Sequence, residues 1–489
     1  MRPLTRRLRD RIGLYEAIAF ATGFILMAFE LVASRILAPT IGTSTYVWTS
    51  VIGVMIAALA AGYAVGGWLA DKRSEKTDIA WLLLGAALAI MVTDICYDSV
   101  LTGISGLLSD PRAAGVAASL ILFVPPSFVL GMASPYLARL RVQSLHTTGR
   151  SVAGLSAANS VGGITGTFCT GFIFFTIIGS RETLTLLAGV LIACSWFVAP
   201  LAVRRQRLLV TAALILMMLL QFATGASAAG VAEIDTPTSH YKITDITWRG
   251  QPVRTLIMGP GGWQSGVYLN GSKDLAFDYT RKLADVVSAA PYKDSILILG
   301  GGAFSLPEYL GQHYPDAQID VAEIDSKLPG IATQYFGYKQ PPNVHVYTED
   351  ARTYLQRTDK RYDIIIADVY NDSSIPFSMT TVEYAASLKH ALKPQGVVAA
   401  NIIAATNTAC MPLLASLHTT YASAFDRALY YPLEDPTLQS EQNIIAVYSN
   451  TSLGWADALP GSSFMQLHGG HTLTDNHAPI EYLKQKCSG

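Results

Sequence analysis

The stretch Ile296-Leu297-Ile298-Leu299-Gly300-Gly301-Gly302 decides the fold of the C-terminal half of this 489-residue chain. Four consecutive apolar residues that run into glycines are typical of a buried β-strand ending in a tight turn. Further strand patterns with helix-length segments between them follow at residues 318–324, 344–347, 362–368 and 396–401. Repeated strand–helix units predict a mostly parallel, doubly wound sheet, and therefore a Rossmann-like α/β fold.

Acidic residues close the successive strands of this predicted sheet. Ligands of such sheets bind at the carboxyl ends of the strands, where a glycine turn lets the backbone approach them closely. Glu323, with Asp325 nearby, closes the second strand and is suited to accept hydrogen bonds from ribose hydroxyls. Asp350 and Asp368 close the next two strands. The set predicts an adenosine ligand. A dinucleotide stays open, although the turn lacks the third glycine of GxGxxG. The alternative is that the acids only cap the helices that follow.

A small β-rich element precedes this α/β pattern. Residues 241–248 and 253–258 form two strand patterns separated by a tight turn, and 264–269 suggests a third. A helix is expected over 275–290.

The N-terminal half has the composition of a membrane domain. The whole chain is 51% hydrophobic and only 15% charged, whereas soluble domains carry about 25% charged residues. Charges are scarce before residue 229, so we predict a polytopic membrane domain at 1–228 and a globular domain at 229–489. Seven stretches are long and apolar enough to span a bilayer, namely residues 14–37, 47–70, 79–97, 113–137, 153–178, 183–202 and 208–226.

The basic residues predict how these seven spans are oriented. One set of loops carries fourteen Lys and Arg residues, and the opposite set carries only Arg112 and Arg181. Because short cytoplasmic loops are the basic ones, the N-terminus is expected in the cytoplasm and the C-terminal domain outside it. This prediction needs an odd number of spans. Pro125-Pro126 makes a broken or re-entrant fourth span conceivable.

Charged residues and glycine pairs lie inside the predicted spans. Glu30, Arg35 and Asp94 are expected to meet partners on other helices or to mark a functional site; Arg35 and Asp94 have the alternative of reaching the membrane interface. Gly62-xxx-Gly66 and Gly162-xxx-Gly166 predict close helix packing.

Composition argues against two classes of partner. The net charge of −1 gives no indication of nucleic-acid binding. No CxxC or Cys/His spacing indicates a metal site. Cys410 and Cys487 would face an oxidising compartment under the predicted topology, where they form either a disulfide or two free thiols.

The C-terminal half resembles the spermidine synthase (aminopropyltransferase) group of class I methyltransferase-like folds. The matching motifs are Gln264-Ser265, the 296–302 strand and turn, Ala322-Glu-Ile-Asp325, Glu349-Asp-Ala351, 362–368 and Leu392-Lys-Pro-Gln-Gly-Val397. The N-terminal half resembles the fused membrane-spanning relatives of that group, through residues 30–39, Val47-Trp48, Gly62-Tyr63, Gly66-Gly67 and Asp71. Residues 474–481 resemble their C-terminal signature.

The resemblance implies a donor site built from the residues named above. Gly300 to Gly302 would cradle a thioether nucleoside. Glu323 would bind the ribose beside Asp325, and Asp350 would contact the adenine amino group. The donor would be decarboxylated S-adenosylmethionine or S-adenosylmethionine, with no metal.

The same resemblance implies an acceptor site next to the donor. Asp368 would act beside the attacking amine, because a carboxylate can orient an amine and accept its proton. Tyr370 and Asp372 would line the acceptor pocket as further catalytic residues. Gln264, counted with the donor-binding residues, would cap it together with Tyr279.

Two positions depart from the family pattern. Soluble spermidine synthases carry an Asp directly after the triple glycine, where this chain has Ala303. They read Asp-Ser-Thr-Asp-Pro after the strand, whereas this chain reads Asp368-Val-Tyr-Asn-Asp372. Both departures weaken the case for a diamine acceptor and for the decarboxylated donor, and they leave an S-adenosylmethionine-dependent methyltransferase open.

The sequence therefore predicts a seven-span helical bundle followed by a Rossmann-like transferase domain. The favoured function is a membrane-anchored aminopropyltransferase that acts on a small-molecule amine in polyamine synthesis. The alternatives are a methyltransferase, a transporter with an altered sensor domain, and a scaffold without catalysis. Relatives of this kind commonly form homodimers. A domain outside the cytoplasm has no obvious supply of donor.

Overall fold

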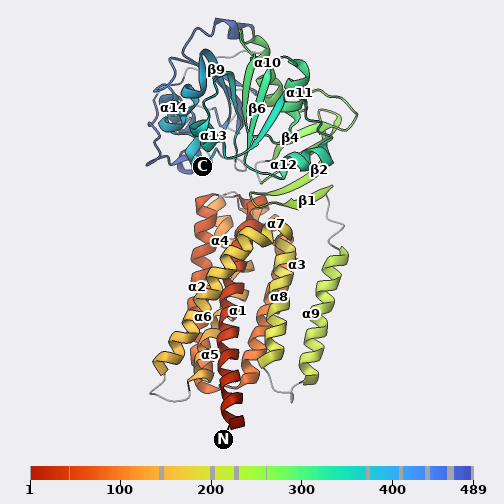
Figure 1. Cartoon of the computed structure of the whole chain (residues 1–489), viewed down its shortest axis with the longest axis vertical. Coiled ribbons are helices and arrows are strands. Elements are labelled where there is room, and N and C mark those ends of the chain that lie inside the picture. Colours follow the sequence, from red (N-terminus) through yellow and green to blue (C-terminus); the bar gives the residue numbers. More distant parts are fainter. Residues whose placement is uncertain are drawn as a thin grey trace. The chain divides into compact units, whose positions relative to one another are not determined.

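A computed structural model of the chain (Figure 1) describes residues 2–42, 44–108, 110–142, 148–198, 204–224, 231–259, 262–370, 375–406, 411–434, 441–459, 467 and 469–485. Cys410 and Cys487, and with them the disulfide considered above, lie outside these ranges. The chain divides into two compact units. The helical unit comprises Met1–Ala229 with Ile234–His240, and the α/β unit comprises Gly230–Glu233 with Tyr241–Gly489.

All seven stretches predicted as spans are helical in the described residues. The helices are α1 (Arg2–Ile41), α2 (Thr45–Lys72), α3 (Lys76–Leu107), α4 (Pro111–Leu122), α5 (Val124–Arg141), α6 (Thr148–Cys169), α7 (Phe175–Ile177), α8 (Ser180–Val198) and α9 (Arg204–Thr224). Among the described residues, four are long and apolar enough to cross a membrane, namely α1 from Gly13, α2, α3 and α8, and the bent pair α4–α5 would be a fifth. These helices are compatible with membrane spans, while the seven-span topology and its orientation stay predictions.

The predicted break in the fourth stretch is confirmed between α4 and α5, which meet at 53°. Pro126 has no N–H group, so the carbonyl of Leu122 loses the partner that it would have in a continuous helix. The Thr93 hydroxyl of α3 donates to that carbonyl at 2.7 Å. A neighbouring helix thus satisfies the freed carbonyl, as the apolar interior of the unit requires.

Glycines bring pairs of helices into backbone contact. A Cβ at Gly162 would lie 2.0 Å from the Phe20 carbonyl oxygen, and one at Gly166 would lie 2.3 Å from that of Phe24. The Gly62-xxx-Gly66 pair of α2 meets α5 in the same way. The predicted role of both glycine pairs in close packing is confirmed.

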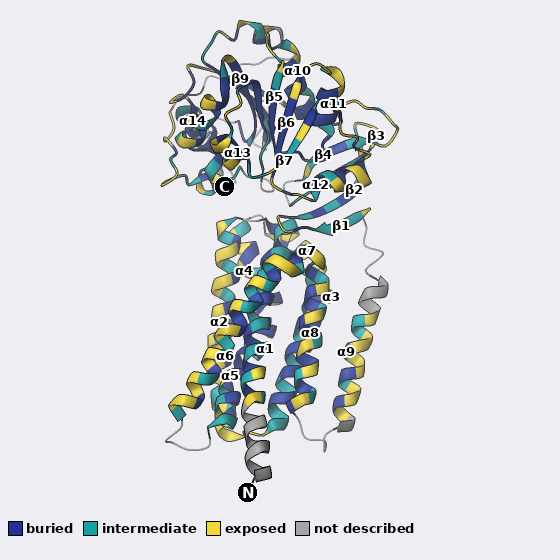
Figure 2. Cartoon of the chain, viewed as in Figure 1, coloured by how far each residue is buried: buried dark blue, intermediate teal, exposed yellow. Residues whose placement is uncertain are grey.

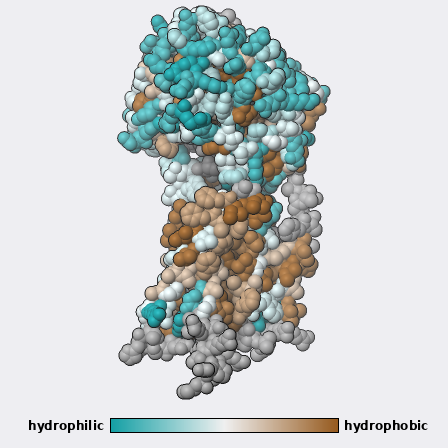
Figure 3. All heavy atoms as spheres, in the orientation of Figure 1, coloured by the Kyte–Doolittle hydropathy of each residue, from teal (hydrophilic) through white to brown (hydrophobic). Residues whose placement is uncertain are grey.

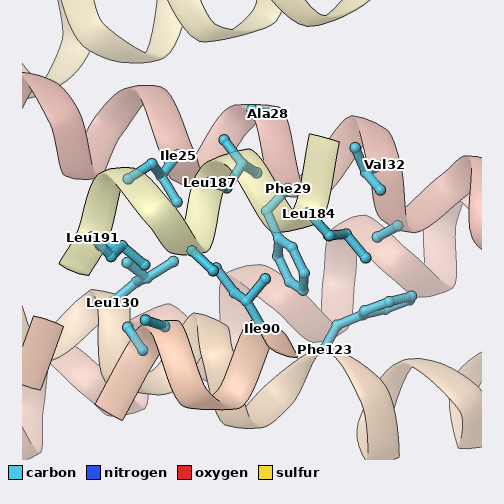
Figure 4. Packing of buried hydrophobic residues seen from close by; sticks show 14 of the residues in the cluster. Ile25, Ala28, Phe29, Val32, Ile90, Phe123, Leu130, Leu184, Leu187 and Leu191 are labelled. Atoms are coloured by element: carbon cyan, nitrogen blue, oxygen red, sulfur yellow. The ribbon is translucent and has the colours of Figure 1, made fainter. Parts of the chain in front are cut away.

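All the long helices contribute to the core of the helical unit, and Figure 4 shows the part where side chains from α1, α3, α5 and α8 meet Phe123 at the α4–α5 break. Phe29 and Phe123 meet edge to face with their ring centroids 5.8 Å apart. Large apolar side chains such as Ile56 and Trp68 are exposed on the outside, and apolar residues dominate the face of the helical unit in Figure 3. Apolar residues on both the inside and the outside are typical of helices surrounded by lipid.

Arg35 meets another predicted span, as expected, through Phe175 of the 153–178 stretch, and it also binds residues that follow α9. Its guanidinium donates to the carbonyl oxygens of Thr236 (2.5 Å) and Pro237 (2.6 Å) and lies 3.9 Å from the Asp235 carboxylate. It also covers the ring of Phe175, at 4.1 Å from the centroid. Arg35 therefore holds residues 235–237, which belong to the helical unit although they follow α9 by several residues.

Asp94 is 2% exposed within the helical unit. It interacts electrostatically with Arg181 of α8. Of the two readings offered by the sequence, a partner on another helix is the one that the structure favours for Asp94.

The α/β unit contains the two sheets that the sequence predicted. The smaller sheet has the order β1-β2-β3-β4 and is formed by β1 (Ala232–Asp235), β2 (His240–Trp248), β3 (Gln251–Ile257) and β4 (Trp263–Tyr268). The larger sheet has the order β10-β11-β9-β8-β5-β6-β7, and its strands are β5 (Ser295–Leu299), β6 (Gln318–Glu323), β7 (Val344–Thr348), β8 (Tyr362–Ala367), β9 (Leu392–Ala404), β10 (Arg427–Pro432) and β11 (Gln442–Ser449). The order is that of a class I methyltransferase-like fold.

Strands β5 to β9 are parallel, and β10 and β11 add an antiparallel edge. The helices are α10 (Asp278–Ala289), α11 (Ser305–His313), α12 (Leu328–Phe336), α13 (Ala351–Arg357), α14 (Val382–Ala391), α15 (Pro412–Tyr421) and α16 (Ile480–Gln485). The central strands are buried (Figure 2), as their continuous apolar runs require. The sequence reading did not include β10 and β11.

We expect Gly162→Ala to lower the free energy of unfolding of the helical unit by at least about 1 kcal/mol. The new methyl group has to push α6 away from the α1 backbone. Thermal unfolding of the detergent-solubilised chain would measure the change. Gly154→Ala is the matched control, since a Cβ at this α6 position meets no atom within 4 Å and alanine is the better helix former. Equal effects of the two substitutions would contradict the packing described here.

Candidate functional site

The order of the strands brings the ends of β5, β6 and β8 to one edge of the larger sheet. From β5 the chain passes to β6 on one side, and it later returns to β8 on the other side. A ligand crevice forms at such a switch point. The Asp368 amide donates to the Leu299 carbonyl at 3.0 Å, so the chain that leaves β8 lies against the glycine turn that leaves β5.

The glycine turn needs its glycines at two places. Gly300 has φ +94°, and a Cβ there would lie 2.3 Å from the Asp368 carbonyl oxygen. Gly302 has φ +53°, and its Cβ would meet the Ser265 side chain at 3.2 Å. Any other residue at Gly300 would separate β5 from the segment that follows β8.

Glu323 fastens the turn to the end of β6. One carboxylate oxygen accepts the Gly301 amide and the other accepts the Asp325 amide, both at 2.8 Å. Burial raises the pKa of Glu323, and the two amides act in the opposite direction. Each carboxylate oxygen keeps a second lone pair, which leaves capacity for ribose hydroxyls.

Asp325 lies behind Glu323 and is 1% exposed. The Tyr241 hydroxyl donates to one of its oxygens at 3.0 Å, and the Lys327 amide donates to the other at 2.9 Å. Its contacts fix the turn that begins α12 and place Asp325 beneath the predicted ribose site.

Asp350 caps α13. One of its oxygens accepts the Thr353 amide at 3.0 Å and the Thr353 hydroxyl at 3.2 Å. Asp350 thus caps the helix that follows, as the sequence alternative allowed, and its half-buried carboxylate also lies at the end of β7, where the adenine is predicted. The Asp368 carboxylate has a different partner, on β9.

The Asp368 side chain is held by a chain of amides and a tyrosine. Asn401 of β9 donates to it at 2.9 Å, and Asn443 of β11 donates to the Asn401 side chain, also at 2.9 Å. The Tyr279 hydroxyl lies within hydrogen-bonding reach of Asp368 and donates to the Gln264 carbonyl at 2.5 Å. Burial raises the pKa of Asp368 to about 6, with Asn401 and Tyr279 acting to lower it.

Asn401 and Asn443 were missed by the sequence reading. Asn401 is 5% exposed in an otherwise apolar strand. A polar residue at such a position has to be hydrogen-bonded, and that signal was available in the sequence. Only the antiparallel pairing of β9 with β11 shows that Asn443 orients Asn401.

The hydroxyl of Tyr370 is occupied by the β9 backbone. It donates to the Asn401 carbonyl at 2.8 Å and accepts the Ile403 amide at 2.7 Å. Its contacts therefore attach the segment after Asp368 to β9. Asp372, the other acid predicted there, lies outside the described residues.

A small, mostly apolar cavity lies beside Asn401, between the sheet and helices α14 and α15. Tyr384, Tyr421 and Tyr448 form much of its wall, and the backbone that leads to Asp368 borders it at Ala367. The cavity gives the described site one apolar side.

Residues 276–454 match the model of the spermine/spermidine synthase domain. The C-terminal part of this chain is a spermidine synthase domain. The chain is 32% identical over 190 residues to the polyamine aminopropyltransferase of Vibrio vulnificus, which covers 38% of this chain and 60% of that protein. It thus spans less than two thirds of that relative's length.

Two further similarities concern the same domain. The chain is 30% identical over 120 residues to the eEF1A lysine and N-terminal methyltransferase of Bos taurus, covering 22% of this chain and 17% of that protein. A crystal structure of a probable spermidine synthase from Corynebacterium glutamicum aligns with a TM-score of 0.42 and 22% identity, covering 54% of this chain and 95% of that one.

The pKa of Asp368 predicts how the stability of the spermidine synthase domain depends on pH. The folded chain holds the proton up to about pH 6, whereas an unfolded aspartate releases it near pH 4. The free energy of unfolding that this group contributes therefore falls as pH rises from about 4 to 6 and stays low above that range. An asparagine does not titrate, so Asp368→Asn removes this pH-dependent loss of stability.

We expect Asp368→Asn to be more stable than the parent chain by roughly 1–3 kcal/mol at pH 7. The difference should vanish near pH 4, and thermal unfolding at both pH values would measure it. A variant that is equally or less stable at pH 7 would show that Asp368 is not held in an unfavourable charged state.

Proposed function

We propose that the spermidine synthase domain transfers an aminopropyl group from decarboxylated S-adenosylmethionine to an amine. The observation that carries the proposal is the Asp368 carboxylate, held by Asn401 at 2.9 Å beside the glycine turn. A carboxylate so placed attracts a cationic amine, orients it and accepts its proton. The side chain that holds it, Asn401, is neutral and leaves the negative charge of the carboxylate uncancelled.

The reaction is a displacement at carbon. The nitrogen lone pair of the acceptor attacks the propyl carbon that is bonded to the sulfonium. The carbon–sulfur bond breaks, and its electron pair returns to sulfur, which leaves a neutral thioether nucleoside. The new ammonium loses a proton, for which Asp368 is the acceptor. Because the donor already carries a good leaving group, positioning of the two reactants supplies most of the acceleration that this step needs.

The donor would lie along the glycine turn. Gly300, Gly301 and Gly302 present backbone without side chains to it, and Glu323 offers its remaining lone pairs to the ribose hydroxyls. Asp350 would meet the adenine amino group from the end of β7. Tyr370 would position the acceptor side through its attachment to β9.

A second candidate is methyl transfer from S-adenosylmethionine. Ala303 is 1% exposed and places a methyl group where soluble spermidine synthases carry the aspartate that binds the donor's free amine. The hydroxyls of Ser265 and Ser305, 3.4 Å apart, flank the neighbouring Gly302. Neutral hydroxyls accommodate an amino-acid tail that carries both charges better than a lone ammonium.

The proposal includes a membrane location with seven spans, the N-terminus in the cytoplasm and the spermidine synthase domain outside it. Four long apolar helices and the fourteen-to-two distribution of basic residues support it. Under this topology the helical unit would have to deliver the donor or the acceptor. A homodimer through the spermidine synthase domain belongs to the same proposal.

Calorimetric titration of the purified chain with each donor separates the two candidates. We expect decarboxylated S-adenosylmethionine to bind at least about tenfold more tightly than S-adenosylmethionine, a difference of about 1.4 kcal/mol. Asp368→Asn should abolish turnover of amine acceptors while the donor still binds. The reverse preference would establish methyl transfer, and failure of both donors to bind would refute the transferase proposal.

Activity should depend on the protonation of Asp368. We expect kcat/KM to fall below about pH 6, where the carboxylate is protonated and no longer attracts the amine. Asn401→Ala removes a hydrogen bond that favours the charged form of Asp368. The pH below which kcat/KM falls, the acidic limb of the pH profile, should therefore rise by about one pH unit. Thr406→Ala is a suitable control, because this buried hydroxyl near the end of β9 bonds Gln442 rather than Asp368. An unmoved acidic limb in Asn401→Ala would assign the ionisation to another group.

A further inference from the structure

The C-terminal segment 471–483 is docked on the helices that cover one face of the larger sheet. The His471 amide donates to the Ser416 hydroxyl at 3.1 Å, and the Leu473 amide donates to the Thr420 hydroxyl at 2.9 Å. Leu473, Ile480 and Leu483 are buried in the core of this face. The segment is therefore an integral part of the spermidine synthase domain, although it lies beyond the region matched by the family model.

Asp475 of this segment forms a bidentate ion pair with Arg352 of α13. The two guanidinium nitrogens donate to the two carboxylate oxygens at 2.8 and 2.5 Å. The Arg352 side chain is 14% exposed and that of Asp475 is 41% exposed. A bidentate pair with one largely buried partner fixes the orientation of both groups, unlike a solvated surface pair.

The same pair also holds the loop that follows β8. Arg352 donates to the Ser378 carbonyl at 2.7 Å, and the Thr381 hydroxyl donates to Asp475 at 2.8 Å. Thr381 is also the N-cap of α14. The Asp475 amide donates to Glu383 at 3.1 Å. Asp475 therefore ties the start of α13 to the far end of the loop that begins at Asp368.

Arg352 is two residues from Asp350, and their charges interact. Without Asp475, the guanidinium would be a partly buried cation without its bidentate carboxylate, and the acids whose charges still act on it would be Glu383 and Asp350, of which Asp350 stands at the start of the same helix. A new Arg352–Asp350 pair would pull Asp350 from its cap on Thr353 and neutralise it. Asp475 prevents this because it offers Arg352 two ideally placed oxygens.

We propose that Asp475 is a positioning residue for the nucleoside site, which keeps Asp350 available to the adenine by holding Arg352 away from it. The inference rests on the proposed function, because it assigns Asp350 to the adenine. It gives the C-terminal segment a part in donor binding, although no residue of that segment contacts the donor in this proposal.

The test compares Asp475→Asn with the parent full-length chain in detergent. The probe is 5′-methylthioadenosine, whose binding does not depend on which donor is used. We expect its dissociation constant and the KM for the donor to rise about tenfold, and kcat to change by less than about twofold. The charge-reversed pair Asp475→Arg with Arg352→Asp should recover part of the affinity, since it restores the ion pair.

Arg357→Gln is the matched control. Arg357 lies on the same helix and forms an ion pair with Glu349 at 2.6 Å, but it is well exposed and touches neither the C-terminal segment nor the β8–α14 loop in the contacts of the described residues. Its removal should leave the affinity for 5′-methylthioadenosine unchanged.

Three results would overturn the inference. The first is that Asp475→Asn binds 5′-methylthioadenosine as tightly as the parent chain does. The second is that Asp475→Asn loses affinity, kcat and thermal stability together, without recovery in the charge-reversed pair, which would show a purely structural role. If the parent chain binds neither 5′-methylthioadenosine nor either sulfonium donor, the proposed function fails, and the inference fails with it.

Discussion

The approach of Gly300 to the main chain of Asp368 is the contact on which the candidate site depends. The two positions are 68 residues apart in sequence, and a single Cβ at Gly300 would lie 2.3 Å from the Asp368 carbonyl oxygen. The switch point of the sheet exists because two neighbouring parallel strands end at the same level. Because of this contact, the glycine turn after β5 and the segment after β8 lie directly against each other. The Glu323 and Asp368 carboxylates stand on either side of the glycine turn.

The polar groups of this edge are held in an unfavourable environment by specific partners. Burial raises the pKa of Asp368 to about 6, and the hydrogen bond from Asn401 acts against this rise. A carboxylate with this pKa is charged near neutral pH but remains a competent base. Glu323 shows the same balance, with backbone amides in place of side chains. Burial of these carboxylates thus lowers the stability of the fold but keeps a defined charge at a defined position.

The two units follow different packing rules. In the spermidine synthase domain the apolar side chains are gathered inside, and a buried polar residue such as Asn401 has a partner on a neighbouring strand. In the helical unit, apolar side chains lie on both sides of the helices, and helix contacts depend on glycines such as Gly162 and on hydroxyls such as Thr93. Under the proposed membrane location, lipid would give no hydrophobic gain in bringing helices together, which makes close backbone packing the main contact between them.

The sequence by itself determined the local elements and the residues at strand ends. Apolar runs such as Ile296–Leu299, bounded by a glycine turn, favour buried strands, and the Pro125-Pro126 pair favours a break in a helix, so local rules indicated both the parallel sheet and the α4–α5 break. The strand-end acids were also visible, because they stand at positions where local patterning stops.

Only the tertiary structure decided which of these groups work together. The partners of Asp368 come from β9 and from α10, and the partner of Arg352 comes from a segment 123 residues away. Arg35 meets Phe175 of another predicted span, as expected, but its hydrogen bonds go to residues beyond α9, which the sequence did not indicate. Local periodicity records which face of an element is buried but not which distant residue it meets, because that choice is made by strand order and by the pairing of segments far apart in the chain.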